Sequence, residues 1–397
     1  MVASAPMRLS PRVGRIGESA TLRVSRRAAE LRAAGREVID FGAGEPDFDS
    51  PPVAVEAARR ALAEGQTRYA PASGTPVLRQ ALAERLRAVY GAPWTAADVV
   101  VTVGAKAALF QLALALFDAG DEVVLPTPCW VSFPEQIRFA GAEPVEVPLS
   151  AEDGFRIRAE PLVAAMTERT RAVLVNSPSN PTGGTISPDE LGALAAACAE
   201  RGALLISDET YERFVYDGEH ASVASLAAEH PETVVLVGSF SKAYAMTGWR
   251  VGYVFGPPDV ISAVSNIQSH ATSNVTTFAM VGAVSALREA EPEVERMIGV
   301  YRDRRDFLVP RLNELPGVDC PMPAGAFYAF PAVAGAYGDG LRGSIAFAEA
   351  LLEEAGVAVV PGAAFGDDDH VRISFACARD DLERGLARMD SFLRNRR

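Results

Sequence analysis

The sequence contains few of the residues that build metal and disulfide sites. Among its 397 residues are four cysteines and four histidines. No two cysteines form a Cys-x-x-Cys pair, which argues against a disulfide framework or a zinc cluster and favours reduced thiols in a cytoplasmic protein. No two histidines have the i, i+4 spacing of a helical metal site, so a metalloenzyme is not expected.

The chain also lacks an excess of positive charge and long apolar runs. Its formal net charge of -13 repels phosphate backbones and anionic lipid surfaces. No window of about 18 uncharged apolar residues occurs, and the N-terminus has no apolar stretch of signal-peptide length. We therefore expect no nucleic-acid partner and no membrane association.

The central part of the chain has the pattern of an α/β protein. From about residue 95 to 260, short runs rich in Val, Ile and Leu alternate with helical patterns, which is typical of a mainly parallel sheet covered by helices. One helix is introduced by Ser187 as a predicted N-cap. The predicted strands span residues 99–103, 122–125, 172–176, 204–207, 234–238 and 252–255. The helices between them include residues 106–116 and 188–200.

The C-terminal part has a different pattern of predicted secondary structure. A charged helical pattern over residues 294–312 leads into shorter strand-like segments and a last helix near residues 382–393. These features favour a second, smaller α+β domain. The first 50 residues are too few for an independent domain, and we expect them to pack onto the C-terminal part. We predict a large domain over residues 51–290 and a small domain built from residues 1–50 and 291–397.

Polar residues that follow the predicted strands are candidates for chemistry, because ligands of strand-helix folds bind beyond the carboxyl ends of the strands. Asp208, Lys242, Asn180 and Lys106 all stand at such positions. Each of them alone is a weak signal. An aspartate at a strand end also caps helices, and a lysine there commonly reaches solvent.

The surroundings of Lys242 strengthen the functional interpretation. Ser239, Ser241 and Arg250 lie in the same segment, which therefore offers an amine, two hydroxyls and a guanidinium. A phosphate group requires such donors, and an amine in a partly desolvated, cation-rich pocket has the lowered pKa that Schiff-base chemistry needs. A carboxylate such as Asp208 is the partner expected for the pyridine nitrogen of pyridoxal phosphate (PLP).

Several separated segments together resemble one family. The segments S-N-P-T-G, S-D-E-T-Y, S-F-S-K-A-Y-A-M-T-G-W-R and H-V-R-I-S occur in the order and spacing of the class I and II aminotransferases, which have fold type I of the PLP enzymes. G-A-G-E-P-D-F, R-Y-A-P-A-S-G and V-G-A-K-A-A-L-F resemble the bacterial aspartate aminotransferase branch. The similarity extends over nearly the whole chain.

The resemblance implies a role for each matching residue around the cofactor. Lys242 would form the Schiff base and move a proton from the substrate Cα, while Asp208 pairs with the pyridine nitrogen. Tyr211 and Asn180 would hydrogen-bond the phenolate oxygen, and Trp130 would stack on the ring unless it is only a packing aromatic. The implied phosphate-binding residues are Ser239, Ser241, Arg250, the backbone N–H groups of Ala105 and Lys106, and Tyr69 from the neighbouring subunit. A homodimer with shared active sites follows.

The resemblance also implies a substrate site. Arg372 would clamp the α-carboxylate with help from Asn180, Trp130 and the backbone of Gly44, although a structural ion pair is an alternative for this arginine. Residues 266–280 contain no arginine, so the cross-subunit arginine of one aspartate aminotransferase branch is absent. The other branch uses a lysine at the position of Lys106 and an S-x-T pair, which Ser19 and Thr21 match. Ser19 could instead be a helix N-cap, and Glu18 departs from the pattern of that branch.

The predicted function is PLP-dependent transamination between aspartate and 2-oxoglutarate by a ping-pong mechanism. Two alternatives use the same residues: a broad or aromatic substrate range, and a lyase of the same fold such as a C–S β-lyase. Release of pyruvate and ammonia without a keto acid would distinguish the lyase. A regulatory protein with an aminotransferase-like domain is disfavoured, because the acidic chain has no segment for a DNA-binding module.

Overall fold

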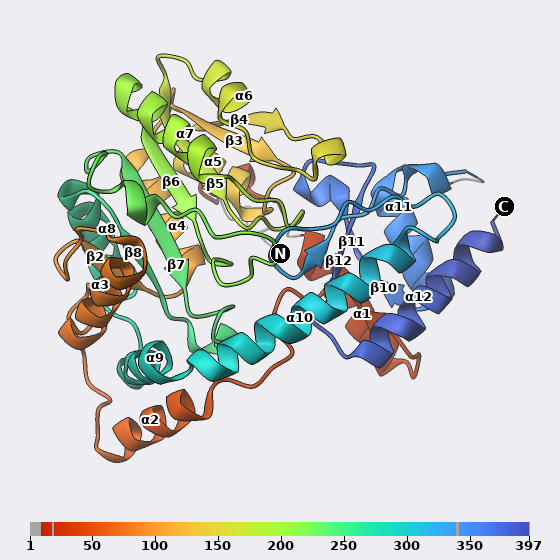
Figure 1. Cartoon of the computed structure of the whole chain (residues 1–397), viewed down its shortest axis with the longest axis horizontal. Helices are drawn as coiled ribbons and strands as arrows, with labels where there is room; N and C mark the ends of the chain where they lie inside the picture. Colours follow the sequence, from red (N-terminus) through yellow and green to blue (C-terminus); the bar gives the residue numbers. More distant parts are fainter. Residues whose placement is uncertain (1–8, 18–19, 339–340, 397) are drawn as a thin grey trace, which may run out of the picture.

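The structure is a computed structural model, and it describes residues 9–17, 20–338 and 341–396. A seven-stranded sheet forms the centre of the larger part of the molecule, and the C-terminal residues form a smaller part beside it (Figure 1). The predicted α/β fold with a mainly parallel sheet is confirmed. Among the described residues, no helix combines the length and the apolar character needed to cross a bilayer.

The central sheet has the strand order β2-β8-β7-β6-β5-β3-β4. β8 runs antiparallel to both of its neighbours, and the remaining strand pairs are parallel. All six predicted strands are present. The strands are β2 (Val99–Thr102), β3 (Glu122–Thr127), β4 (Glu143–Pro148), β5 (Thr170–Asn176), β6 (Leu204–Asp208), β7 (Val234–Ser239) and β8 (Gly252–Phe255).

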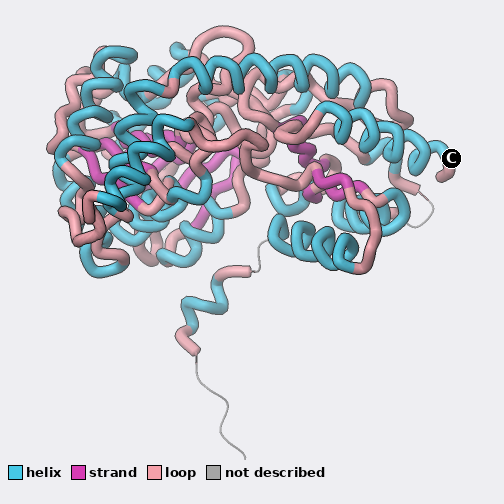
Figure 2. The backbone as a smooth tube through the Cα atoms, turned by 90° about the horizontal axis from the view of Figure 1, so that it is seen from below, coloured by secondary structure: helices cyan, strands magenta, loops and turns pink. Residues whose placement is uncertain are grey.

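Helices cover both faces of this sheet, because successive strand residues point to opposite faces (Figure 2). Val100 and Val254 belong to one hydrophobic cluster, whereas Val99 and Val101 belong to another. The first face is covered by α4 (Ala105–Leu116), α5 (Ser132–Ala140) and α8 (Pro258–Ala271). The second is covered by α3 (Pro76–Tyr90), α6 (Ala159–Ala164), α7 (Pro188–Arg201) and α9 (Thr277–Glu289), and α2 (Pro52–Ala63) packs on α9. The predicted N-cap is present, since Ser187 Oγ accepts a hydrogen bond of 3.3 Å from the Glu190 N–H.

The smaller part joins both ends of the chain. β1 pairs in parallel with β10, and α1 contacts β10 and β11. A hydrophobic cluster that includes Phe41 and Tyr301 forms its core. The elements are α1 (Ala20–Ala33), β1 (Ile39–Asp40), α10 (Glu291–Leu312), β9 (Tyr328–Ala329), α11 (Gly343–Ala350), β10 (Val357–Ala358), β11 (Val360–Pro361), β12 (Val371–Ser374) and α12 (Arg379–Arg394). We propose that these two parts are two domains, residues 51–290 and residues 1–50 with 291–397.

Candidate active site

A cavity of 330 Å³ lies at the carboxyl ends of β5, β6 and β7, beside the N-terminus of α4. β9 and β12 of the smaller part contribute Tyr328 and Arg372 to its lining. The cavity brings together twelve of the predicted site residues: Gly44, Ala105, Lys106, Trp130, Asn180, Asp208, Tyr211, Ser239, Ser241, Lys242, Arg250 and Arg372.

Lys242 follows the end of β7 and is half-buried. Its Nζ donates a hydrogen bond to the carbonyl oxygen of Gly44. Burial lowers the pKa of Lys242 to about 8, and the positive charges of Arg372 and Arg250 act in the same direction. Lys242 and Lys106 are the two lysines of the whole sequence, and both line this cavity. Amine chemistry on this chain is therefore concentrated at one site.

Asp208 is the last residue of β6 and is buried. Its Oδ1 accepts a hydrogen bond of 3.0 Å from the Thr210 N–H, and burial raises its pKa to about 6. The side chain of Asn176 donates to the Asp208 carbonyl at 2.9 Å, which ties the ends of β5 and β6 together. Asp208 ends β6 and is followed by a turn, not by a helix that it could cap, and its carboxylate lines the cavity at a pKa that leaves it mostly ionised at neutral pH.

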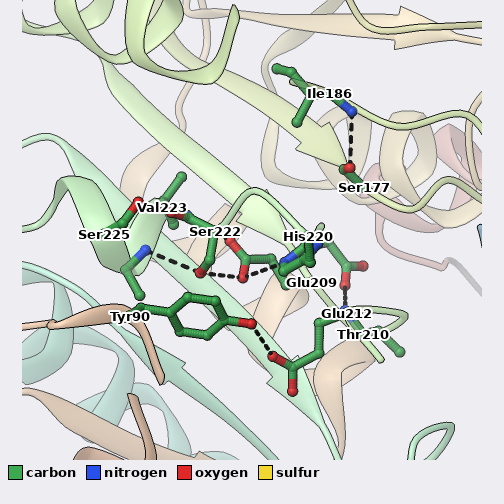
Figure 3. Close-up of polar contacts among 12 residues, drawn as sticks. Tyr90, Ser177, Ile186, Glu209, Thr210, Glu212, His220, Ser222, Val223 and Ser225 are labelled. Carbon is green, nitrogen blue, oxygen red and sulfur yellow. Dashed lines mark hydrogen bonds and ion pairs between the residues drawn. The ribbon is translucent and has the colours of Figure 1, made fainter. Parts of the chain in front are cut away.

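The turn after β6 is anchored on its outer side by Glu209, whose carboxylate is buried (Figure 3). It accepts hydrogen bonds from Ser222 Oγ at 2.6 Å and the Val223 N–H at 2.9 Å, and its Oε2 lies 3.0 Å from His220 Nε2. Burial alone would lower the pKa of His220, but the hydrogen bond with Glu209 and its charge raise that pKa above the ordinary value of 6.5. Glu209 therefore fixes one side of the turn while Asp208 faces the other.

A second anchor of the same turn is Glu212. Its carboxylate pairs with Arg85 of α3 at 2.8 Å and accepts a hydrogen bond of 3.0 Å from the Tyr90 hydroxyl. Burial alone would raise the pKa of Glu212, but the guanidinium of Arg85 holds it below its ordinary value. Because Glu212 is held outside, the neighbouring Tyr211 points to the cavity.

An anion cradle lies at the start of α4. Ser239 Oγ donates to Ser241 Oγ at 2.9 Å, and Arg250 Nη1 lies 3.5 Å from the same Ser241 oxygen. Gly104 precedes α4 with a φ of 79°, and a Cβ at this position would lie 2.2 Å from Arg250 Nη2. The missing side chain lets the guanidinium approach the unpaired N–H groups of the first helical turn, which is an arrangement that binds phosphate.

Arg372 lies on β12 and is 3% exposed. Its Nη1 donates to Asn180 Oδ1 at 3.0 Å and its Nη2 to the Gly42 carbonyl at 2.8 Å, while Nε has no partner among the described residues. The ring of Tyr328 lies 4.5 Å from the guanidinium carbon. These acceptors are uncharged, so the positive charge is left for an anion to compensate, and the alternative of a structural ion pair is not supported.

Lys106 and Trp130 lie together at the cavity wall. Lys106 Nζ is 4.8 Å from the centre of the Trp130 ring, within the range of a cation–π contact. Burial lowers the pKa of Lys106, and the charge of Arg250 adds to this shift. Trp130 also packs edge-on against Phe133 at 5.3 Å, so it serves both as a packing aromatic and as part of the cavity lining.

Of the three remaining predicted site residues, only Tyr69 has a described side chain, and it is not part of this lining. Tyr69 is 90% exposed in the isolated chain and lies between α2 and α3. Ser19 and the side chain of Thr21 lie outside the part of the chain that the structure describes.

The structure also adds residues that sequence reasoning missed. Tyr328, Asn176, Thr210 and Thr247 line the cavity. Asn176 follows an apolar run and could have been found by the same strand-end rule that indicated Asp208. Tyr328 is in the run A-F-Y-A-F, which reads as a buried strand and gives no sign of a polar contact.

Comparison with known proteins assigns the chain to a protein family. Residues 36–389 match the family model described as aminotransferase class I and II. The chain belongs to the aminotransferase class I and II family. It is therefore an aminotransferase, and the members of this family are PLP enzymes.

The relatives cover nearly the full chain. The probable aspartate/prephenate aminotransferase of Aquifex aeolicus is 46% identical over 97% of this chain and 98% of its own length. The aspartate aminotransferase of Geobacillus stearothermophilus is 44% identical over 98% of this chain and 100% of its own. Among solved structures, aspartate aminotransferase from Thermus thermophilus with maleate matches with a TM-score of 0.93 at 44% identity, covering 97% of this chain and 100% of that one.

The depressed pKa of Lys242 predicts its reactivity. Only a neutral amine attacks an electrophile, so labelling of Lys242 in the cofactor-free protein should rise through about pH 8. An unperturbed lysine would react near its ordinary pKa of 10.5. Amine-reactive labelling at a series of pH values, followed by peptide mass spectrometry, measures this directly. A half-maximal rate near pH 10.5 would show that the cavity does not perturb the amine.

The close approach at Gly104 predicts a second result. Gly104→Ala and Gly202→Ala both force alanine to positive φ, at 79° and 65°, but only the first places a Cβ against Arg250. We expect Gly202→Ala, which lies in the left-handed helical region, to lose about 1 to 2 kcal/mol of stability. Gly104→Ala should lose at least as much, because a φ of 79° with a ψ of 163° is essentially restricted to glycine. Only Gly104→Ala should bind PLP more weakly, by roughly ten-fold or more, because the guanidinium is displaced from the cradle. Equal PLP affinity in the two variants, measured by fluorescence titration, would contradict the role of Arg250 and the start of α4 in binding phosphate.

Proposed function

We propose that this aminotransferase binds PLP in the cavity and moves the amino group between aspartate and 2-oxoglutarate by a ping-pong mechanism. The observation that supports an acidic substrate most directly is the presence of two separate cations, Arg372 and Lys106, in the cavity that also holds Lys242. A dicarboxylate has one anionic group for each of these cations. We place the protein in the cytoplasm, in accord with its four free cysteines.

The residues of the cavity fit PLP at each of its functional groups. The cradle of Ser239, Ser241 and Arg250 with the backbone of Ala105 and Lys106 suits the phosphate. Asp208 suits the pyridine nitrogen, and Tyr211 with Asn180 suits the phenolate oxygen. When bound, PLP supplies an aldehyde that condenses with amines and a ring that withdraws electrons.

Each side chain then has a defined task. Lys242 would hold the cofactor by its Nζ, and its free amine would move a proton between the substrate Cα and the aldehyde-derived carbon of the cofactor. Asp208 keeps a proton on the ring nitrogen, since its buried carboxylate gains a cationic partner. Trp130 covers the ring face and limits the access of water. Tyr211 donates its hydroxyl proton to the phenolate oxygen.

Arg372 is proposed to bind the α-carboxylate, with Asn180 and the backbone of Gly44 beside it. The uncharged partners of its two Nη atoms and the unpartnered Nε are consistent with this role. Every amino-acid substrate has this carboxylate, so Arg372 does not distinguish one amino acid from another.

Lys106 is proposed to bind the distal carboxylate, together with Ser19 and Thr21. Of the 38 basic residues of this sequence, 36 are arginine, so a lysine at this position is itself informative. An ammonium is a compact charge with three donors, which suits a single carboxylate. The Thermus thermophilus relative was solved with maleate, a dicarboxylate, and relatives are named for aspartate and for prephenate, which is also a dicarboxylate.

The alternatives are less well supported. A C–S β-lyase would use Lys242, Asp208 and Arg372 equally well, but the relatives are named as aminotransferases. A mainly aromatic substrate range would leave the charge of Lys106 without a partner.

A homodimer with shared sites is proposed from the position of Tyr69. This side chain is 90% exposed, and a groove lined by Val55, Leu62, Trp249 and Arg250 leads along the surface to the phosphate cradle. Val55 and Leu62 are themselves about half exposed, at 48% and 46%. A second copy seated on this groove would cover both and bring its own Tyr69 to the phosphate.

The role of Lys242 gives the first functional prediction. Lys242→Ala should abolish transamination and leave PLP binding largely intact, because the ring and phosphate contacts remain. Borohydride reduction should attach the cofactor to Lys242 in the wild type and should not attach it to Lys106, the remaining lysine, in the variant, as read out by peptide mass spectrometry. Wild-type-like turnover in Lys242→Ala would contradict the catalytic role assigned to Lys242.

The proposed active site shared between two subunits gives the second functional prediction. A hybrid of Tyr69→Phe and Lys242→Ala subunits has one active site with both changes and one with neither. Mixing the two weak variants should therefore restore activity, approaching half of the wild-type value per dimer. If hybrid dimers verified by native mass spectrometry show no recovery, Tyr69 acts within its own subunit or not at all.

The proposed binding of the distal carboxylate by Lys106 gives the third functional prediction. Lys106→Met removes the charge and keeps an apolar chain against Trp130. Loss of one partner of a buried charge pair costs about 2 to 5 kcal/mol, so kcat/KM for aspartate and glutamate should fall by roughly 30-fold or more. Alanine and phenylalanine should lose far less. An unchanged ratio of acidic to neutral substrates, at full PLP occupancy, would remove Lys106 from substrate recognition.

A further inference from the structure

Tyr328 is a hydroxyl-bearing residue of the cavity that has no role in the function proposed above. It lies on β9, is 1% exposed, and comes from the smaller part of the molecule. Its hydroxyl is 2.8 Å from that of Tyr211, which follows β6 of the central sheet, so the pair joins the two parts of the molecule inside the site. Its ring also lies beneath the guanidinium of Arg372.

The two tyrosines have two hydroxyl protons between them. Their mutual hydrogen bond uses one of these protons and leaves the other for a further hydrogen bond. Either oxygen can donate in this bond, and each tyrosine has a single hydroxyl proton. Burial raises the pKa of both Tyr211 and Tyr328 above the ordinary value of 10, so both are protonated at neutral pH. If Tyr211 donated to Tyr328, it would have no proton left for a ligand. The direction of this one bond therefore decides what Tyr211 presents to the cavity.

The charges around the pair set that direction. Arg372, whose guanidinium carbon is 4.5 Å from the Tyr328 ring, favours loss of a proton from Tyr328 and so makes its hydroxyl the better donor. Arg372 acts on the Tyr211 hydroxyl as well, but there the negative charge of Asp208, three residues earlier in the chain, opposes it, whereas no carboxylate of the described residues opposes it at Tyr328. This difference makes the Tyr211 hydroxyl the poorer donor and the better acceptor of the two. Both effects favour donation from Tyr328 to Tyr211.

We propose that Tyr328 is a positioning residue that donates its hydroxyl proton to Tyr211, so that the Tyr211 proton points into the cavity toward the phenolate oxygen of PLP. This inference rests on the PLP site proposed above. An oxygen that accepts one hydrogen bond becomes a stronger donor in the next, so Tyr328 also strengthens the bond that Tyr211 makes. The phenyl ring of Tyr328 supports Arg372 independently of its hydroxyl.

The test uses the PLP-loaded enzyme and three variants: Tyr328→Phe, Tyr211→Phe and the double variant. The readout is the pH titration of the absorbance of the Lys242-bound cofactor. A donor to the phenolate oxygen favours the deprotonated state, so its loss raises the apparent pKa. Tyr211→Phe should raise it by about one unit, and Tyr328→Phe by a smaller amount in the same direction.

Coupling between the two residues separates positioning from a general effect. The double variant should titrate like Tyr211→Phe, because Tyr328 acts only through Tyr211. Additive shifts, or no shift in Tyr328→Phe, would overturn the proposal. In Tyr328→Phe the ring remains beneath Arg372, so kcat should fall while KM for the amino acid stays near the wild-type value. A raised KM without a spectral shift would show that Tyr328 serves Arg372 alone and would also overturn it.

Tyr216→Phe is the matched control. Tyr216 is a buried tyrosine of the same aromatic cluster, and its hydroxyl donates to the Ala326 carbonyl at 2.5 Å, two residues before Tyr328. Loss of the Tyr216 hydroxyl should lower stability without changing the apparent pKa of the Lys242-bound cofactor. A shift in Tyr216→Phe as large as that in Tyr328→Phe would show that the shift comes from general disturbance of the aromatic cluster and would overturn the proposal. Borohydride attachment of PLP to Lys242 in every variant confirms the site itself, so failure of that step counts against the proposed function and not against Tyr328.

Discussion

Four positive side chains converge on one cavity of a strongly acidic protein, and the chemistry of the site depends on this convergence. Lys242, Lys106, Arg250 and Arg372 all line it, and Asp208 is the carboxylate that lines it with them. Burial lowers the pKa of the Lys242 amine to about 8, and repulsion by the other three cations acts in the same direction against the opposing charge of Glu45. The same repulsion would be relieved by bound anions, which is why we propose that the cavity takes a cofactor with a phosphate and a substrate with carboxylates.

The protein holds these cations by uncharged groups. Arg372 is held by an amide oxygen and a backbone carbonyl, and Arg250 approaches the start of α4 because Gly104 has no side chain. Charged partners are placed instead behind the site, where Glu209 and Glu212 anchor the turn that presents Asp208 and Tyr211. Asp208 lies in the lining and Glu45 acts on Lys242, but the carboxylates of Glu209 and Glu212 lie behind the ligand-binding face and position it.

Much of this arrangement could be predicted from the sequence. Apolar runs at regular spacing predicted the strands of the central sheet, and their ends indicated Asp208, Asn180 and Lys242. β4 was missed because Pro144 and Pro148 and an alternating exposed pattern are features of an edge strand rather than of a buried one.

Other features depend on tertiary contacts that no local pattern contains. Tyr328 is 117 residues from the tyrosine it bonds, and its own segment reads as core. The anchoring role of Glu209 follows only when residues 220–223 are seen against it. The sequence motif indicated Tyr69 through resemblance alone, since its proposed partner belongs to a second chain.

The most direct test of the whole scheme is a half-reaction screen of the PLP-loaded enzyme with single amino acids and no keto acid. Loss of the absorbance of the cofactor aldehyde form is followed for each amino acid in turn. Aspartate and glutamate should convert the cofactor fastest, because only they engage both Arg372 and Lys106. Conversion that is equally fast with neutral amino acids, or absent with the acidic ones, would contradict the assignment of the two cations.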